Sequence, residues 1–203
     1  EGHVAILMAV YDGARSLQGQ LQSLMDQTHT NWQLLCSDDG SSDNSAALLE
    51  QFAGQHSDYV TCLHGPGQGA ARNFLYLIRE AAQHCDPGAW MAFCDQDDVW
   101  LSDRLSRGMA ALRREDDETP ALYCSRTWIT DEALNGRRLS VARPKPPGFR
   151  NALVQNIASG NTILLNPAAA RLISEAANEV SDVVVHDWWV YQLITGAGGR
   201  VIH

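Results

Sequence analysis

Five aspartates in two short stretches have the residue types and spacing best suited to chemistry in this chain. Asp38 and Asp39 follow one apolar run, and Asp95, Asp97 and Asp98 follow another. Three carboxylates within four residues repel one another, and a divalent cation relieves such repulsion. Mg²⁺ and Mn²⁺ are commonly held by one or two carboxylates together with substrate phosphates. The pattern predicts a site for a metal ion and a phosphate-bearing ligand; the alternative for the second stretch is a solvated acidic turn.

Asp187 lies beside two tryptophans near the C-terminal end, within the string Val-His-Asp-Trp-Trp of residues 185–189. An aspartate next to aromatic rings can serve as a general base beside a surface that stacks on a sugar. The apolar residues 183–185 have strand character, which would put Asp187 at the end of an element. The structural interpretation is a helix-capping aspartate with core tryptophans. His186 would be a partner of Asp187 in the first case and a core residue in the second.

Glycine-rich motifs narrow the range of ligands. Gly65, Gly67 and Gly69 form a cluster, but their spacing is not GxGxxG, and no GxxxxGK[ST] occurs. A nicotinamide enzyme is therefore disfavoured and a P-loop is excluded. The cluster precedes a helix that carries Arg72 and Asn73. It either brings backbone close to a ligand or forms a flexible turn before that helix.

Composition excludes several classes of partner. The 203 residues include 15 basic and 24 acidic side chains, for a formal net charge of −9. No basic stripe is present, so nucleic acid is not expected as a partner. The five cysteines show no CxxC spacing and are expected to be buried thiols in a reduced compartment. No signal peptide and no apolar run of membrane-spanning length occur.

Apolar patterning predicts alternating strands and helices. Strands are expected over residues 4–11, 32–36, 59–63, 90–94, 121–129, 162–165 and 201–202. Helices are expected over residues 17–25, 46–52, 70–82, 101–114, 168–177 and 187–194. The proline-containing stretch 130–149 is expected to be a loop or flap. This order predicts an α/β fold with a mostly parallel twisted sheet and helices on both faces.

The expected sheet positions the acidic clusters. Ligands of open α/β sheets bind beyond the carboxyl ends of the strands, so both clusters are expected to face one cleft. Residues 4–203 are expected to form a single domain, with residues 1–3 an unrelated remnant. The last expected strand has no continuation, which suggests a domain truncated at its C-terminus.

Several segments, in their joint order and spacing, resemble family 2 of the inverting glycosyltransferases, which have the GT-A fold. They are residues 4–13, 23–28, 37–43, 69–73 and 95–97, the last standing as a DxD motif. Asp12 stands where the family usually has Asn. The strings at 95–100 and 186–189 resemble the rhamnosyltransferase-type branch. An aromatic–Arg–x–His segment that usually follows is absent, and His203 does not stand in that context.

The resemblance implies roles for individual positions. Nucleotide binding is implied for Ala9, Tyr11, Asp38, Asp39, Arg72, Asp95 and Gln96, with Asp39 accepting from a pyrimidine N3–H. Asp97 and Asp95 would bind Mn²⁺ or Mg²⁺, and Asp187 would be the catalytic base. Contacts to sugar or acceptor are implied for Asp98, Trp100, Gly160, Asn161, His186 and Trp188.

The resulting functional hypothesis is metal-assisted glycosyl transfer. A UDP- or dTDP-sugar, with dTDP-rhamnose among the candidates, would donate to a hydroxyl of a saccharide or lipid-linked acceptor. Single displacement would invert the anomeric centre, and no covalent nucleophile is needed. The expected location is the cytoplasm, including peripheral association with the inner face of the cytoplasmic membrane.

Two other hypotheses are weighed against transfer. A nucleotidyltransferase would need a glycine-rich turn after the first strand, where only Gly13 and Arg15 stand. A non-catalytic nucleotide-sugar- or carbohydrate-binding domain would keep Asp39 but would not need both Asp97 and Asp187.

Overall fold

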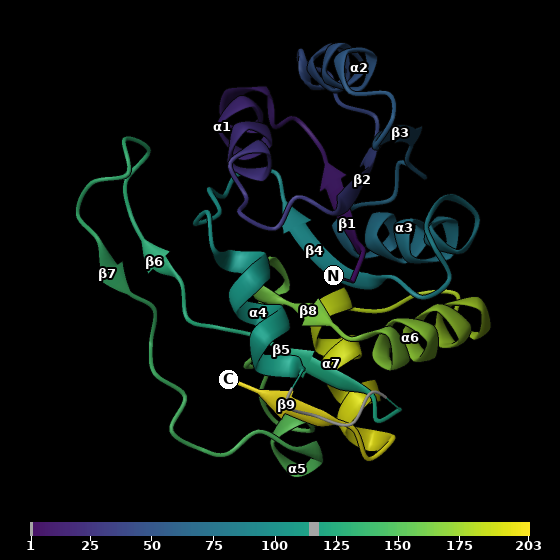
Figure 1. Ribbon diagram of the computed structural model, residues 1–203, viewed down its shortest axis with the longest axis vertical. Helices are drawn as coiled ribbons and strands as arrows, with labels where there is room; N and C mark the ends of the chain where they lie inside the picture. Colours follow the sequence, from purple (N-terminus) through teal and green to yellow (C-terminus); the bar gives the residue numbers. More distant parts are fainter. Residues whose placement is uncertain (1, 114–117) are drawn as a thin grey trace.

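The computed structural model describes residues 2–113 and 118–203. Its centre is a seven-stranded sheet in the order β3-β2-β1-β4-β8-β5-β9 (Figure 1). The strands are β1 (Val4–Val10), β2 (Trp32–Asp38), β3 (Val60–His64), β4 (Trp90–Asp95), β5 (Ala121–Tyr123), β8 (Leu164–Leu165) and β9 (Arg200–Ile202). The helices are α1 (Ala14–Met25), α2 (Ser45–Gln55), α3 (Ala70–His84), α4 (Arg104–Leu112), α5 (Phe149–Ala152), α6 (Pro167–Glu179) and α7 (His186–Gly196), with a 3-10 turn η1 (Gly160–Thr162).

The sheet is mostly parallel, as the alternation of strands and helices predicts. Strands β3, β2, β1 and β4 run parallel to one another and are joined by helical crossovers. Strand β8 runs antiparallel to β4 and β5, and β9 is parallel to β5. Parallel strands with helical crossovers have their carboxyl ends at one edge of the sheet. The acidic residues come directly after these strand ends and so lie at that edge.

Helices cover both faces of the sheet. Val4, Ile6 and Met8 of β1 pack on one side with α1, α2 and α4, whereas Leu7 packs on the other side with α3, α6 and α7. Alternate residues of a strand point to opposite faces, so a strand buried on both faces is a continuous apolar run. In Figure 1, α1 and α4 lie to the left of the parallel strands and α3 and α6 to the right.

Three expected elements differ from the structure. The strand predicted over 121–129 ends at Tyr123, and Trp128–Ile129 form β6 of a separate ribbon with β7 (Arg138–Leu139). Both residues of β6 are exposed, so the apolar run does not continue into the core. The strand predicted over 162–165 begins only after η1, and residues 183–185 form no strand. Periodicity cannot separate exposed from buried apolar runs. The expected end of the fourth helix, Arg114, lies outside the described residues.

The stretch predicted as a flap forms a long arm. Between β5 and α5 the chain leaves the sheet, pairs β6 with β7, and returns along the side of the molecule (left in Figure 1). At the N-terminal end, by contrast, His3 belongs to the folded structure. Its ring hydrogen-bonds to Asn31 and Gln33, and its carbonyl accepts from Trp90 N. None of the helices in the described ranges is long and apolar enough to span a bilayer.

Candidate active site

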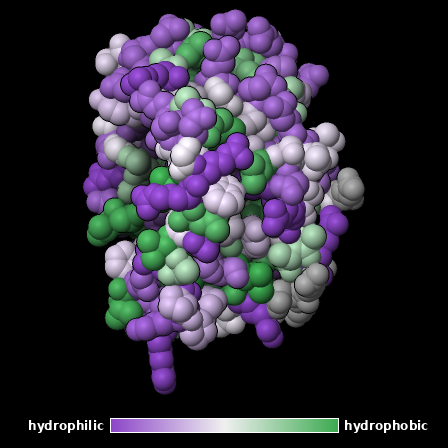
Figure 2. Space-filling model, turned by 90° about the vertical axis from the view of Figure 1, so that its left-hand side faces the viewer, coloured by the Kyte–Doolittle hydropathy of each residue, from purple (hydrophilic) through white to green (hydrophobic). Residues whose placement is uncertain are grey.

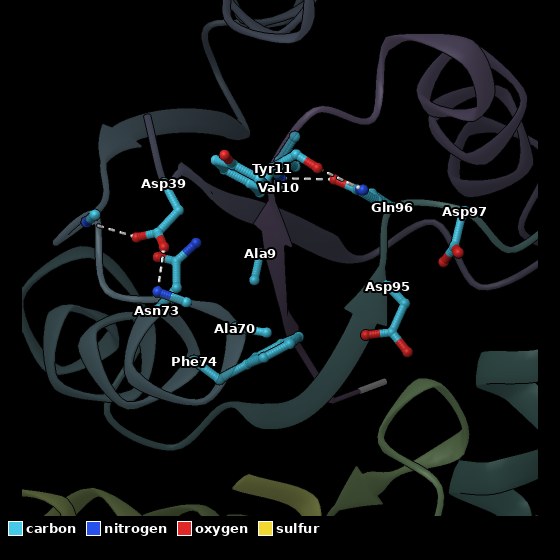
Figure 3. A pocket seen from close by; sticks show the side chains of 12 residues that line it. Ala9, Val10, Tyr11, Asp39, Ala70, Asn73, Phe74, Asp95, Gln96 and Asp97 are labelled. Carbon is cyan, nitrogen blue, oxygen red and sulfur yellow. Dashed lines mark hydrogen bonds between the residues drawn. The ribbon is translucent and has the colours of Figure 1, made fainter. Parts of the chain in front are cut away.

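A cavity of about 450 Å³ lies at the carboxyl ends of β1, β2 and β4. Strand register puts Ala9 beside both Ser37 and Asp95, and Val10 beside Asp38. The lining residues are Ala9, Val10, Tyr11, Asp39, Gly67, Gly69, Ala70, Asn73, Phe74, Asp95, Gln96 and Asp97 (Figure 3). The prediction that Asp39 and Asp97 line one cleft is therefore confirmed.

Asp39 organises one wall of this cavity. Its side chain is buried, and its two carboxylate oxygens accept from Gly67 N at 2.8 Å and Gly69 N at 2.7 Å. Gly65 packs so closely that an added Cβ would lie 2.8 Å from Asp39 Oδ1. A carboxylate oxygen has a second lone pair, so Asp39 can hold this loop and still accept from a ligand.

Asn73 is a lining residue that the sequence-based assignment did not include. It is buried in the first turns of α3, and its amide donates to Ser37 O at 3.0 Å. This bond ties the helix to β2 beside Asp39. Its place after a glycine cluster at a helix start was the available signal.

The loop after β2 is held by acids that do not line the cavity. Asp38 accepts from the backbone N–H groups of Gly40 and Ser41. Asp12 accepts from Ser42 N at 2.7 Å and from Asp43 N at 3.3 Å. Asp12 has a φ of 45°, a conformation that Asp and Asn tolerate better than most residues. Asp12 was not among the predicted site residues, and Asp38 stays a prediction for nucleotide binding.

Gln96 joins the ends of β1 and β4. Its Oε1 accepts from Tyr11 N at 2.7 Å, and its Nε2 donates to Tyr11 O at 2.8 Å. An added Cβ on Gly13 would lie 2.5 Å from the Gln96 side chain, so glycine is required for this contact. Because its amide is used in this way, Gln96 positions Tyr11, a residue that is 57% exposed and lines the cavity (Figure 3).

The acidic cluster forms the opposite wall. Burial, with the charges of Asp98, Asp97 and Asp187, raises the pKa of the Asp95 carboxyl to about 7. Burial also raises the pKa of Asp98, although Asn161 Nδ2 donates to its carboxylate at 2.6 Å. Asp97 is exposed at the cavity. The negative charges of Asp95, Asp97 and Asp98 therefore repel one another, as their spacing in the sequence predicts.

Arg104 is a half-buried cation behind this cluster, and the sequence-based assignment does not include it. Its Nη2 donates to Asn161 O at 2.8 Å, and its guanidinium lies 3.5 Å from the centre of the Trp100 ring. Burial lowers the pKa of Arg104 to about 10, so the group stays charged at neutral pH. Its charge lowers the pKa of Asp95 and Asp98 against the effect of burial. The available signal is an aromatic ring, Trp100, four residues before an arginine, a pair that can form a cation–π contact.

The donor set fits a divalent cation that shares its ligands with a substrate. Asp95 and Asp97 offer carboxylate oxygens, and the pKa of Asp95 is raised first by burial and then by the negative charges of neighbouring aspartates. Within the described residues no three acidic, imidazole or thiol groups are arranged as a complete metal site. Mg²⁺ and similar ions usually take their remaining ligands from water and phosphate, so two carboxylates suffice on the protein side.

Asp187 lies in a second cavity of about 330 Å³. The lining residues are Ser125, Arg126, Thr127, Ser140, Val141, Arg143, Asn156, Ile157, Ser159, Asp187 and His203. Asp187 stands in the first turn of α7, where its carboxylate accepts from Gly160 N at 2.9 Å and Trp188 N at 2.6 Å. Burial raises the pKa of Asp187, and these hydrogen bonds oppose that rise. The negative charge of Asp187 also contributes to the raised pKa of Asp95, after burial and the charges of Asp98 and Asp97.

Two residues expected to contact sugar or acceptor are instead buried. The Trp100 ring packs with α1 and α4 beneath Arg104 and lines neither cavity. The His186 ring stacks on Phe74 with centroids 3.8 Å apart. Both rings are expected at the ligand because they stand beside acidic residues. In the structure each ring is instead buried against apolar neighbours on its own face of the sheet, which removes more of its surface from water.

The other residues that are predicted to contact the ligand form hydrogen bonds or ion pairs with protein groups. Gly160 and Asn161 of η1 hold Asp187 and Asp98 by hydrogen bonds. Trp188 is half-buried and donates through Nε1 to Ala152 O at 2.7 Å. Arg72 is exposed outside the cavity lining and pairs with Asp182 at 2.9 Å. Their contacts to ligand stay predictions.

Burial of His186 predicts a pH-dependent stability. Burial lowers its pKa to about 3, against 6.5 when exposed, so the unfolded chain binds a proton below pH 6.5 that the folded chain does not. This contribution to stability is present above pH 6.5 and is lost as the pH falls. From pH 7 to pH 5, His186 alone should cost about 2 kcal/mol of unfolding free energy.

Denaturant unfolding at both pH values checks this expectation. His186→Gln should lower stability at both pH values yet reduce the difference between them by about that amount. An unchanged difference in the variant would show that other groups carry the pH dependence.

The chain is similar to known glycosyltransferases. The family model described as "Glycosyl transferase family 2" matches residues 5–179. The chain is 28% identical to the Escherichia coli UDP-Glc:alpha-D-GlcNAc-diphosphoundecaprenol beta-1,3-glucosyltransferase WfgD, over 81% of this chain and 62% of the relative. It is 24% identical to the Shigella flexneri dTDP-rhamnosyl transferase RfbG, over 91% and 63%. The chain thus spans less than two thirds of the length of these relatives.

Solved structures share the fold. S. aureus TarS 1–349 in complex with UDP-GlcNAc has a TM-score of 0.68 at 14% identity, and the match covers 98% of this chain and 56% of the TarS 1–349 chain. The mannosyltransferase PcManGT from Pyrobaculum calidifontis, in complex with GDP-Man and Mn²⁺, has a TM-score of 0.67 at 15% identity, covering 100% and 54%. These likenesses confirm the predicted GT-A fold.

Proposed function

Because the chain belongs to glycosyl transferase family 2, we propose that it binds a nucleoside-diphosphate sugar and transfers the sugar to an acceptor hydroxyl. The observation that carries this proposal is the cavity at the ends of β1, β2 and β4. It has an exposed aromatic ring and a hydrogen-bond acceptor on one side, Tyr11 and Asp39, and acids on the other. That arrangement suits a ligand with a base at one end and a diphosphate at the other.

The nucleoside would occupy the wall formed by Tyr11 and Asp39. Tyr11 offers a ring face for stacking on a base. Asp39 already orders the glycine loop, and its free lone pairs would accept from the N3–H of uracil or thymine. We propose a UDP- or dTDP-sugar as donor, which agrees with the donors in the names of the E. coli and S. flexneri relatives.

The diphosphate would lie at the acidic wall. Asp97 and Asp95 would hold Mn²⁺ or Mg²⁺, while the positive charge of Arg104 behind the cluster favours the ionised form of Asp95. The cation, when bound, would neutralise charge that develops on the diphosphate as the glycosidic bond breaks. The Mn²⁺ in the PcManGT complex supports this cofactor.

Asp187 would take the proton from the acceptor hydroxyl. Its two hydrogen bonds from Gly160 N and Trp188 N hold the carboxylate in the lining of the second cavity and oppose the rise of its pKa that burial causes. A single displacement with one base inverts the anomeric centre. We propose a saccharide or lipid-linked acceptor at the cytoplasmic face of the membrane, in line with the diphosphoundecaprenol acceptor in the name of WfgD.

A binding assay followed by a turnover assay tests the proposal. Calorimetric titration with UDP, dTDP and GDP in Mn²⁺ should show preference for the pyrimidine nucleotides. Mn²⁺-dependent release of UDP or dTDP from a donor sugar then distinguishes an enzyme from a non-catalytic nucleotide-sugar-binding domain. Failure to bind any of the three nucleotides in Mn²⁺ would contradict the proposal.

Asp39→Ala should weaken UDP more than it weakens inorganic diphosphate. Loss of one hydrogen bond to the base costs about 1–3 kcal/mol, and diphosphate makes no such bond. Titration of both ligands in Mn²⁺ measures the difference. Asp26→Ala, an exposed aspartate after α1, provides the same charge change as a control. Equal losses for both ligands would instead indicate that Asp39 acts only by ordering Gly67 and Gly69.

A further inference from the structure

Basic side chains are concentrated in one segment of this acidic protein. Residues 126–150 contain six of the fifteen basic residues and two of the twenty-four acidic ones. The six are Arg126, Arg137, Arg138, Arg143, Lys145 and Arg150, and all are exposed. Among the residues that the structure describes, none of these six pairs with an acid, whereas Glu132 in the same segment pairs with Arg15.

Apolar side chains stand exposed among these charges. On the β6–β7 ribbon, Trp128 lies directly opposite Leu139, so both side chains share one face. Their exposed fractions are 50% and 41%, and Val141 beyond them is 69% exposed. Ile129 and Leu134 are exposed on the same ribbon. Figure 2 views this side of the molecule and shows apolar groups (green) interleaved with polar ones (purple).

We propose that this arm, residues 126–150, docks on the surface of an anionic lipid bilayer. Tryptophan is favoured at the membrane interface, where its ring is apolar and its N–H remains hydrated. Arginine and lysine near the surface are attracted to anionic headgroups. The rest of the molecule is strongly acidic and is repelled by such a surface. Charge complementarity therefore selects both the partner and the face that meets it.

The arm also connects the proposed membrane surface with the second cavity. Arg126, Ser140, Val141 and Arg143 line the cavity that contains Asp187. Docking through the arm would turn this cavity toward the bilayer. If the proposed function holds, a lipid-linked acceptor would then reach Asp187 without leaving the membrane.

Vesicle co-sedimentation tests the docking without reference to catalysis. The chain should sediment with phosphatidylcholine vesicles containing 30% phosphatidylglycerol and stay in solution with pure phosphatidylcholine, and 0.5 M NaCl should release it. R137E/R138E should lower the partition coefficient at least about tenfold, because each basic residue contributes about fivefold. W128S should lower binding while leaving its salt dependence intact.

The control is R107E/R171E, on α4 and α6, which gives the protein the same net charge as R137E/R138E. Its vesicle binding should exceed that of R137E/R138E by the same factor of about ten. Equal loss in both double variants, no binding to anionic vesicles, or binding to polyphosphate in solution without binding to vesicles would overturn the proposal. Affinity for UDP, measured in parallel, should be unchanged in all variants, so failure of docking is distinguishable from failure of the proposed function.

Discussion

Asp187→Asn should lower sugar transfer by about 10²–10⁴-fold, the usual contribution of a positioned general base. Asparagine keeps the shape of the side chain and can still accept from Gly160 N, but it cannot take a proton from the acceptor. Affinity for the donor nucleotide should barely change, because Asp187 lies in the second cavity and not among the residues around Tyr11 and Asp39. Initial rates of transfer and calorimetric nucleotide affinity, measured together, check both parts.

The pH profile gives an independent readout of the same base. Burial raises the pKa of Asp187 above the ordinary aspartate value. The base works when deprotonated, so the transfer rate should fall as the pH drops through this raised pKa, and the Asn variant should lose this acid limb. Asp86→Asn, an exposed residue in the turn before β4, serves as the matched control and should leave transfer unchanged. Near-normal transfer in Asp187→Asn would assign the base to another residue.

Asp97→Ala should remove the metal-dependent part of nucleotide affinity altogether. In Mn²⁺ the affinity for UDP should fall to the value that the native chain shows in EDTA, because Asp97 would supply the exposed carboxylate of the cation site. Affinity in EDTA should be the same for both proteins. Titration calorimetry under the two conditions measures the difference.

Stability should change little in this variant. Asp97 is exposed, and its charge opposes ionisation of Asp95 and Asp98, so its removal relieves like-charge repulsion. Thermal unfolding of the variant therefore checks that the loss of UDP affinity does not come from unfolding of the protein. Asp103→Ala, before α4, is the control for removing an acid near the cluster. Unchanged affinity for UDP in Mn²⁺ would place the cation elsewhere.

The sequence alone was enough to predict the parallel half of the sheet and the edge where the acids gather. Strands β1, β2 and β4 are apolar runs because both of their faces are buried. A continuous apolar run can be recognised in the sequence without knowing which elements pack against it. Right-handed helical crossovers then place their carboxyl ends on one edge. Asp39 and Asp97 follow two of those ends, so their shared cavity follows from local pattern and chain connectivity.

The sequence does not predict which of the apolar runs after β4 are buried and which are exposed. Trp128 and Ile129 continue an apolar run in the sequence, yet they leave the sheet and form the arm. A run of apolar residues carries the same pattern whether a neighbour covers it or not. The structure alone therefore separates β5 from β6.

The partners of the site residues were decided by the tertiary structure. Asp39 meets Gly67 and Gly69, and Asp187 meets Gly160, across 27 to 30 residues of chain. Hydrogen bonds need donor and acceptor within about 3 Å, so they depend on how whole elements pack and not on spacing along the chain. The same holds for the burial of Trp100 and His186. Residue type marks a side chain that can do chemistry, whereas packing determines whether it faces a ligand or the core.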